Sequence, residues 1–262
     1  MNNWEQYALV FEEGVESEFF AIQSANRALS IMENVLMKER GQLIFLLGEP
    51  GSGKTFLLHH ILTNHQEKFK PLYFDFPEQS IERFLEKIIV SLKARPISTD
   101  IDGLKEQAIH LFADRRCLIM IDEAQMLSEP MMEFLRVLAD SKSFWIVLAM
   151  HEEEGRQILR QAHFSSRPHR VIELGDLSRK EVSVFINSSL SHSHDDTLKQ
   201  FFQKHSKYIH TLSRGNFRFL KKLFFTNFML LHEAQENGMS QFKDPSICLL
   251  NMSAIEIGLI DA

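Results

Sequence analysis

The stretch Gly48-Glu49-Pro50-Gly51-Ser52-Gly53-Lys54-Thr55 decides how the rest of the chain is interpreted. It fits the pattern G-x-x-x-x-G-K-[ST] and stands between a strand-like apolar run at 42–47 and a helix-like run at 56–62. A glycine-rich turn between a strand and a helix N-terminus can point successive backbone N–H groups at one phosphate, and the helix dipole adds to the field. We therefore expect a nucleoside triphosphate to be bound by Gly48, Glu49, Pro50, Gly51, Ser52, Gly53, Lys54, Thr55 and Phe56. Lys54 would neutralise the β- and γ-phosphates, and the Thr55 hydroxyl would hold Mg²⁺.

A second motif lies about 70 residues further on, where the apolar run Leu118-Ile119-Met120-Ile121 ends in Asp122-Glu123. A carboxylate at the C-terminal end of a buried strand stands at the edge where open α/β sheets bind their ligands. We expect Asp122 to hold Mg²⁺, directly or through a water. Glu123 is expected to orient or deprotonate the water that attacks the γ-phosphate.

Strands and helices alternate through the first two thirds of the chain. Strands are predicted near 42–47, 71–77, 117–121, 144–150 and 171–174, and helices separate most of them. This alternation predicts a parallel sheet with helices on both faces. Residues 1–40 are expected to be a helical lead-in, whose aromatic residues either anchor the core or cover the adenine; these are Phe11, Phe19 and Phe20.

Two further polar positions follow the last strands. His151 directly follows the fourth strand, where a polar side chain can touch the γ-phosphate or the attacking water, and it is our candidate for that contact. Arg167 and Arg170 precede the fifth strand. Either one could be surface charge or could reach a phosphate held by a neighbouring subunit, a role that suits a bidentate guanidinium.

No strand pattern appears after residue 175, so we predict an α/β domain at 1–175 and a helical lid at 176–262. Helices are expected near 178–190, 197–210, 216–235 and 246–258, the first with a capping box formed by Ser178 and Glu181. Arg218 falls in the first turn of the third helix, where an arginine of an ATPase lid can bind the γ-phosphate.

Composition narrows the class of protein. The 262 residues carry a formal net charge of −6, 44% hydrophobic residues and two cysteines, which is ordinary for a globular protein. No apolar run has the length of a membrane-spanning helix, so we expect a cytoplasmic protein without direct membrane insertion, peripheral at the inner membrane only through partners. Segment 197–222 is an exception to the acidic average, because it has seven lysines and arginines and no acidic residue. Such a segment is either a solvated face or a site for DNA.

With these motifs in this order, nearly the whole chain resembles the AAA+ ATPases. Within that superfamily it is similar to the ExeA/MshM-type secretion and pilus-biogenesis ATPases and to the TniB-type transposition ATPases. The residues that carry the resemblance are Gly48–Thr55 (Walker A), Ile121–Gln125 (Walker B), Ser166-Arg167 (arginine finger) and Gly215–Arg218 (sensor 2). Met150-His151 stands where the group has Gly-Gln, and Phe217 replaces the proline of Gly-Asn-Pro-Arg.

The resemblance implies a five-stranded parallel sheet in the order 5-1-4-3-2, Mg²⁺-dependent ATP hydrolysis and a homo-oligomer, for which a hexameric ring is one arrangement. Arg167 would then act on the nucleotide of the neighbouring subunit. The first hypothesis for biological use is assembly or energy coupling of a secretion, type IV pilus or DNA-uptake apparatus, with its protein components as partners. The alternative is a DNA-associated switch for transposition or replication. A third is a signalling NTPase with slow turnover.

Overall fold

The computed structural model describes residues 3–12, 23–38, 40–64, 69–113, 117–161, 164, 169–191 and 195–261. The chain divides into two compact units. The sheet unit comprises Ala25–Pro50 and Lys54–Leu174. The helical unit comprises Met1–Ser24, Gly51–Gly53 and Gly175–Ala262.

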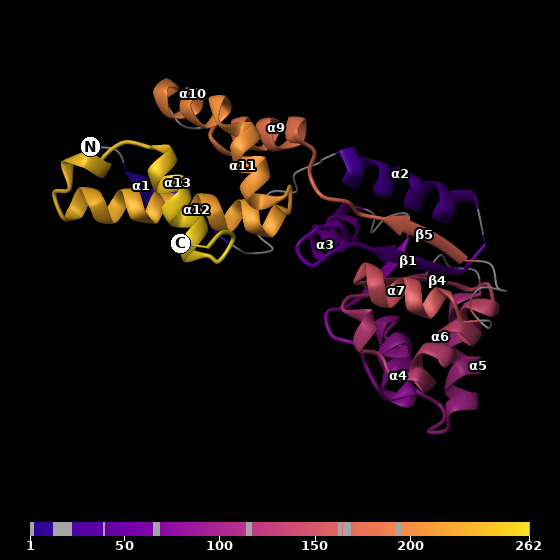
Figure 1. The fold of residues 1–262 in the computed structure, drawn as a ribbon. Coiled ribbons are helices and arrows are strands. Elements are labelled where there is room, and N and C mark those ends of the chain that lie inside the picture. Colours follow the sequence, from indigo (N-terminus) through magenta and orange to yellow (C-terminus); the bar gives the residue numbers. More distant parts are fainter. Residues whose placement is uncertain are drawn as a thin grey trace. The chain divides into compact units, whose positions relative to one another are not determined.

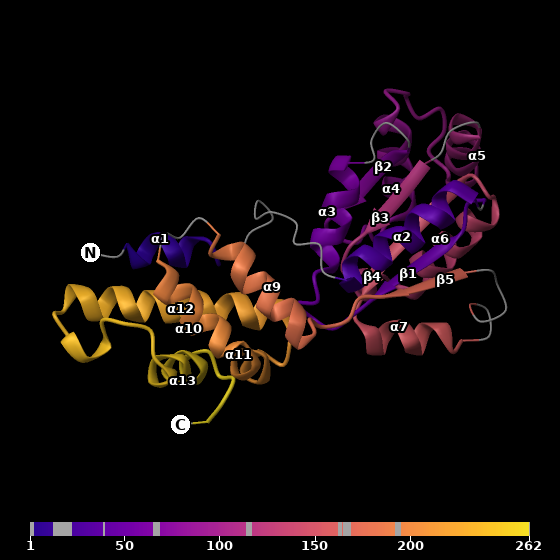
Figure 2. The same cartoon turned by 90° about the horizontal axis from the view of Figure 1, so that it is seen from above.

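The sheet unit is built on five parallel strands in the order β2-β3-β4-β1-β5 (Figures 1 and 2). They are β1 (Leu43–Leu47), β2 (Lys70–Phe74), β3 (Cys117–Ile121), β4 (Phe144–Met150) and β5 (His169–Glu173). This is the order 5-1-4-3-2 expected from the resemblance, so that prediction is confirmed. The register pairs Leu47 with Met150 and Ile121 with Leu148, so the carboxyl ends of the three central strands meet at one edge.

Helices cover both faces of this sheet. They are α2 (Gln23–Lys38), α3 (Lys54–Asn64), α4 (Ile81–Ser91), α5 (Ile101–Phe112), α6 (Glu129–Asp140) and α7 (Glu152–Leu159), with a short 3-10 turn η1 (Ala124–Met126). In Figure 1, α2 and α3 lie on one side of the sheet and α4 to α7 on the other. Strands buried on both faces need continuous apolar sequence, and β1, β3 and β4 are fully buried runs of that kind.

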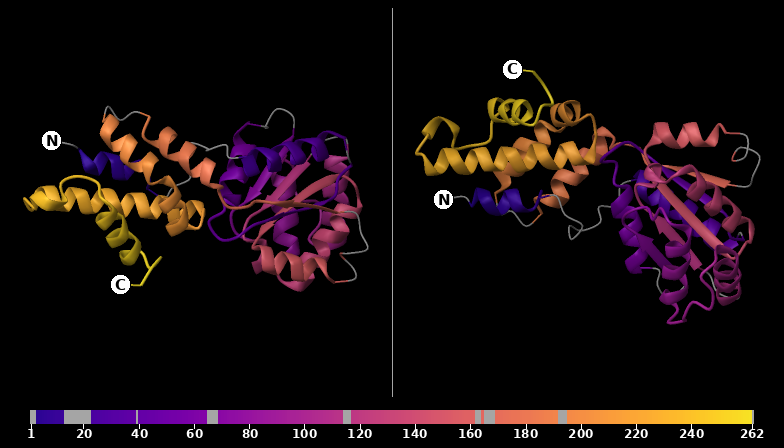
Figure 3. Two further views of the ribbon diagram at one scale, coloured as in Figure 1. Left: turned by 45° about the horizontal axis from the view of Figure 1, so that its top comes forward. Right: turned by 90° about the horizontal axis from the view of Figure 1, so that it is seen from below.

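The helical unit is organised around its longest helix, α12 (Phe217–Glu236), which Figure 3 shows running through it. Around it stand α1 (Trp4–Leu9), α9 (Arg179–Ser189), α10 (Asp196–Lys204), α11 (Ser206–Ser213), η2 (Ser240–Phe242) and α13 (Ile247–Glu256). Its core is aromatic: Phe11 stacks on Phe224 with ring centroids 4.7 Å apart, and Phe202 meets Phe224 edge-on at 5.0 Å. Aromatic pairs in these offset and edge geometries gain energy beyond the area they bury.

Two features of the helical unit differ from the sequence prediction. The helix expected at 197–210 is two helices, α10 and α11, because the backbone at His205 leaves helical geometry and its ring nitrogen lies 2.8 Å from the Phe201 carbonyl. The expected lead-in at 1–40 is also divided, since α1 lies beside α12 and Trp4 stacks on Phe228 at 6.1 Å. Phe11 is therefore a core residue of the helical unit, whereas Phe19 and Phe20 lie outside the described residues.

The predicted capping box of α9 is confirmed, with Ser178 and Glu181 bonding each other's backbone N–H groups. Within the part of the chain that the structure describes, no helix combines the length and apolar character that crossing a membrane requires.

Candidate nucleotide site

The loop after β1 has the backbone that phosphate binding requires. Gly51 and Gly53 have φ angles of +84° and +96°, which L-residues with a side chain rarely adopt. These two glycines turn the chain from the end of β1 into α3, whose first residue is Lys54. The nine residues predicted from Gly48 to Phe56 thus form one continuous strand–loop–helix connection. Phe56 lies half-buried in the first turn of α3.

Two buried polar groups in this loop fit an anion. Lys54 is 7% exposed, and its Nζ donates to the carbonyl oxygens of Gly48 (2.8 Å) and Glu49 (3.1 Å). The hydroxyl of Ser52 is buried and has no hydrogen-bond partner among the described residues. An unsatisfied buried hydroxyl is costly unless something else completes its bonding. A phosphate group would complete it.

The two residues predicted to hold Mg²⁺ are joined directly. The Thr55 Oγ1 hydroxyl donates to Asp122 Oδ2 at 2.6 Å, and Asp122 is 3% exposed. The Asp122 N–H bonds the Phe74 carbonyl at the end of β2, which fixes the backbone at the sheet edge. A hydroxyl beside a carboxylate is a donor set of hard oxygens, the type that Mg²⁺ prefers.

Glu123 adopts a conformation that the sequence did not predict. Its φ and ψ are 49° and 36°, the left-handed region, where a non-glycine residue is uncommon and costs about 1–3 kcal/mol. The Gln125 amide donates to Glu123 Oε2 at 2.5 Å, which orients the carboxylate. Strained residues held by their neighbours are typical of functional sites. The sequence analysis did not predict this contact of Gln125. Two side chains that meet across a turn, two residues apart, leave no periodic pattern in the sequence.

His151 lies close to Glu123, as its place after β4 suggested. His151 Nε2 is 3.9 Å from Glu123 Oε2, and its Nδ1 is 3.7 Å from Glu154 Oε1. The imidazole is about a third exposed. The structure thus brings together Lys54, Thr55, Asp122, Glu123 and His151 from three strand ends of the sheet unit.

Two of the three predicted arginines are among the described residues. Arg167 lies outside the described residues. Arg170 is exposed on β5, an edge strand of the sheet. Arg218 is exposed in the first turn of α12 and belongs to the helical unit. Their roles toward a nucleotide stay predictions.

Residues 37–159, which contain both motifs, match the family model described as AAA domain. This part of the chain is therefore similar to an AAA domain, and the sheet unit has the fold of the AAA+ P-loop ATPases. The chain is similar in fold to Cdc6p from Pyrobaculum aerophilum (TM-score 0.64, 17% identity, 88% of this chain and 66% of that one). It is also similar to the Aeropyrum pernix ORC1 protein in complex with DNA (TM-score 0.62, 13% identity, 95% of this chain and 69% of that one). A Thermotoga maritima RuvB mutant is similar as well (TM-score 0.59, 18% identity, 95% of this chain and 74% of that one).

At these identities the solved structures establish the fold and nothing finer. No curated protein matches the sequence significantly. The match of residues 37–159 to an AAA domain favours nucleotide binding. The closeness to ExeA/MshM-type and TniB-type ATPases stays an expectation.

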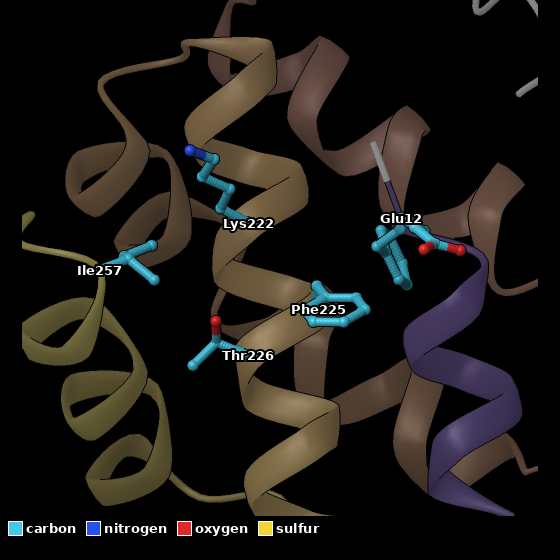
Figure 4. A pocket seen from close by; sticks show the side chains of 6 residues that line it. Glu12, Lys222, Phe225, Thr226 and Ile257 are labelled. Carbon is cyan, nitrogen blue, oxygen red and sulfur yellow. The ribbon is translucent and has the colours of Figure 1, made fainter. Parts of the chain in front are cut away.

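A hollow of about 380 Å³ opens elsewhere, within the helical unit (Figure 4). Lys222, Phe225 and Thr226 reach it from α12, and Phe11, Glu12 and Ile257 complete its lining. None of these residues belongs to the nucleotide motifs. Lys222 is the last residue of the basic segment 197–222, so one end of that segment lines the hollow.

Proposed function

We propose that this ATPase is a DNA-associated switch, in which ATP binding and hydrolysis control assembly of several copies on a duplex. The observation that carries the proposal is the exposure of the basic segment. Five of its seven cations are exposed side chains: Lys204, Lys207, Arg214, Arg218 and Lys222. A segment rich in exposed cations and free of acids can neutralise backbone phosphates without reading sequence. Two fold relatives, the Aeropyrum pernix ORC1 protein and Drosophila ORC, were solved with DNA, which supports the same direction.

The catalytic assignment follows from the contacts at the sheet edge. Lys54 binds the terminal phosphates from the start of α3, where backbone N–H groups and the helix dipole act together. Thr55 and Asp122 are the residues that would hold Mg²⁺, which supplies charge neutralisation between the phosphates. Glu123 accepts a proton from the attacking water or orients it, with His151 and Gln125 setting the position of its carboxylate.

Communication between copies is assigned to the arginines. Arg167, with Arg170 as the alternative, would approach the nucleotide of a neighbouring subunit in a homo-oligomer, which a hexameric ring would satisfy. Arg218 would bind the γ-phosphate from the lid. An arginine supplied by a second subunit makes hydrolysis depend on assembly.

The second candidate is assembly or energy coupling of a secretion, type IV pilus or DNA-uptake apparatus. The resemblance carried by Ile121–Gln125 and Gly215–Arg218 favours it, as does the net charge of −6, which disfavours general nucleic-acid binding. In this role the partners would be protein components of the apparatus, and the chain would act in the cytoplasm or at the inner membrane through them.

DNA binding separates these candidates. The test variant carries Lys204→Glu, Lys207→Glu and Lys222→Glu, all exposed side chains of the basic segment. Lys221 is left unchanged because it is only 4% exposed, so charge reversal there would test folding instead. The matched control carries Lys70→Glu, Lys180→Glu and Lys243→Glu, which are exposed lysines outside the segment and change the net charge equally.

Fluorescence anisotropy of a labelled duplex, with ATP or ADP and at two salt concentrations, is the measurement. We expect ATP to strengthen binding, salt to weaken it, and the test variant to lose at least roughly tenfold in affinity because several phosphate contacts are removed. The control variant should stay within about twofold of the parent. Equal losses in the two variants would contradict the role of the basic segment. No ATP-dependent binding by the parent would contradict a DNA role and leave the secretion candidate.

A further inference from the structure

Tyr73 brings a second hydroxyl to the carboxylate of Asp122. It lies on β2, one residue before the strand ends, and pairs in register with Met120 of β3. The Tyr73 hydroxyl donates to Asp122 Oδ2 at 3.2 Å, the same oxygen that accepts from Thr55 at 2.6 Å. The other oxygen, Oδ1, accepts from the Glu123 N–H at 3.0 Å. Donors from β2, α3 and the turn after β3 thus hold both oxygens.

The phenol is itself fixed in place. The His59 ring of α3 packs on the Tyr73 ring with centroids 4.6 Å apart, which limits its rotation. A phenol hydroxyl whose ring is held in this way is placed to donate to the carboxylate.

This arrangement has a consequence for the Thr55 hydroxyl. A hydroxyl has one hydrogen and two acceptor lone pairs, and Thr55 directs its hydrogen to Asp122. Its lone pairs are then available to a cation. The direction of these lone pairs is constant only if the Asp122 carboxylate is held in one orientation. Tyr73 adds a second hydrogen-bond donor to that carboxylate from the neighbouring strand.

We propose that Tyr73 is a positioning residue of the Mg²⁺ site, holding Asp122 so that Thr55 presents its lone pairs to the metal. The inference rests on the assignment of Thr55 and Asp122 as the metal-holding pair. Hydrogen-bond partners behind a metal site are commonly worth a factor of about 10–100 in metal affinity. Tyr73 lies inside a strand-like run, Leu72-Tyr73-Phe74, so the sequence gives it no feature that separates it from core residues.

The test variant is Tyr73→Phe, which removes the hydroxyl and keeps the ring that packs on His59. The matched control is Tyr208→Phe, which removes a phenol bonded to Asn251 in the helical unit. Mn²⁺ replaces Mg²⁺ as the probe, and its binding in the presence of a non-hydrolysable ATP analogue is followed by electron paramagnetic resonance. Affinity for the analogue without metal, in EDTA, is measured in parallel.

We expect Tyr73→Phe to weaken Mn²⁺ binding by about tenfold while leaving nucleotide affinity in EDTA unchanged. Tyr208→Phe should change neither quantity. The proposal is overturned if Tyr73→Phe binds Mn²⁺ as the parent does, or if it weakens nucleotide binding in EDTA to the same extent, since that is a structural effect. Asp122→Asn tests the underlying assignment separately: parent-like Mn²⁺ binding by this variant would show that the metal is held elsewhere.

Discussion

The hydroxyl of Thr55 lies 2.6 Å from the carboxylate of Asp122, although 67 residues separate them in the sequence. This bond joins the first turn of α3 to the end of β3, the two elements that carry the phosphate loop and the catalytic acids. Thr55 and Asp122 both lie within the sheet unit, so the packing of that unit alone holds them together. A site positioned in this way costs little reorganisation when a substrate is bound.

Loss of the Lys54 ammonium should abolish nucleotide binding. Lys54→Ala removes the one side-chain cation that the phosphate loop itself contributes. We expect affinity for a fluorescent ATP analogue to fall by at least about 100-fold, because charge-assisted hydrogen bonds to phosphate are lost. Lys38→Ala, at the exposed end of α2, is the control and should bind like the parent. Parent-like binding by Lys54→Ala would place the nucleotide elsewhere.

Phe11 should determine the stability of the helical unit. Phe11→Ala deletes a ring that is 1% exposed and stacked on Phe224 and Phe228, so the free energy of unfolding should fall by about 3–5 kcal/mol. The chain has two tryptophans, and Trp4 alone lies in the helical unit, so Trp145→Phe leaves a reporter of that unit. Urea unfolding followed by Trp4 fluorescence measures the loss. Leu9→Ala, an exposed position, should have little effect, and equal effects of the two changes would contradict the packing.

The capping box of α9 should contribute acid-sensitive stability. Burial opposes the charge of Glu181, but hydrogen bonds from Ser178 and from the Gln23 and Ser24 backbone outweigh it, so the pKa of Glu181 is lowered. Its stabilising contribution is complete above the unfolded-state pKa near 4.5 and is lost as pH falls through the lower folded-state pKa. Glu181→Gln should therefore destabilise at pH 7 and converge with the parent as pH falls further below 4.5. Urea midpoints at several pH values test this, and a constant difference across the range would contradict it.

The two cysteines should differ sharply in reactivity. Burial raises the pKa of the Cys117 thiol far above its ordinary value, and the thiolate is the form that reacts. Cys248 is exposed. A thiol reagent should label one cysteine quickly and the second only after denaturation, as mass spectrometry of labelled peptides would show. Rapid labelling of Cys117 in the folded protein would contradict its place inside β3.

Sequence predicted the parts of this molecule whose signals are local. The phosphate loop, the apolar strand that ends in Asp122, and the capping box each consist of residues a few positions apart, and the structure has all three as expected. The strand order came from the resemblance. Short strands with continuous apolar sequence do not by themselves reveal which of them are neighbours.

Contacts between distant residues were missed. Trp4 and Phe228 are neighbours only in space, so the apolar pattern of residues 1–40 could not reveal that α1 belongs with α12. The break between α10 and α11 depends on the backbone conformation of His205 alone. The spacing of apolar residues over several turns does not reveal a change at one residue. The left-handed Glu123 and the Tyr73 bond to Asp122 arise because tertiary structure imposes them. The conformation of Glu123 and the Tyr73 bond are also the two features of this group that lie at the nucleotide site.

Single-turnover hydrolysis by Glu123→Gln tests whether Glu123 acts on the attacking water of a bound ATP. The parent and the variant are compared at saturating nucleotide, after an ATP analogue has been shown to bind both equally. We expect the variant to hydrolyse ATP at least about 100-fold more slowly, because the carboxylate that orients or deprotonates the water is lost. Hydrolysis at the parent's rate by a variant that binds normally would contradict it.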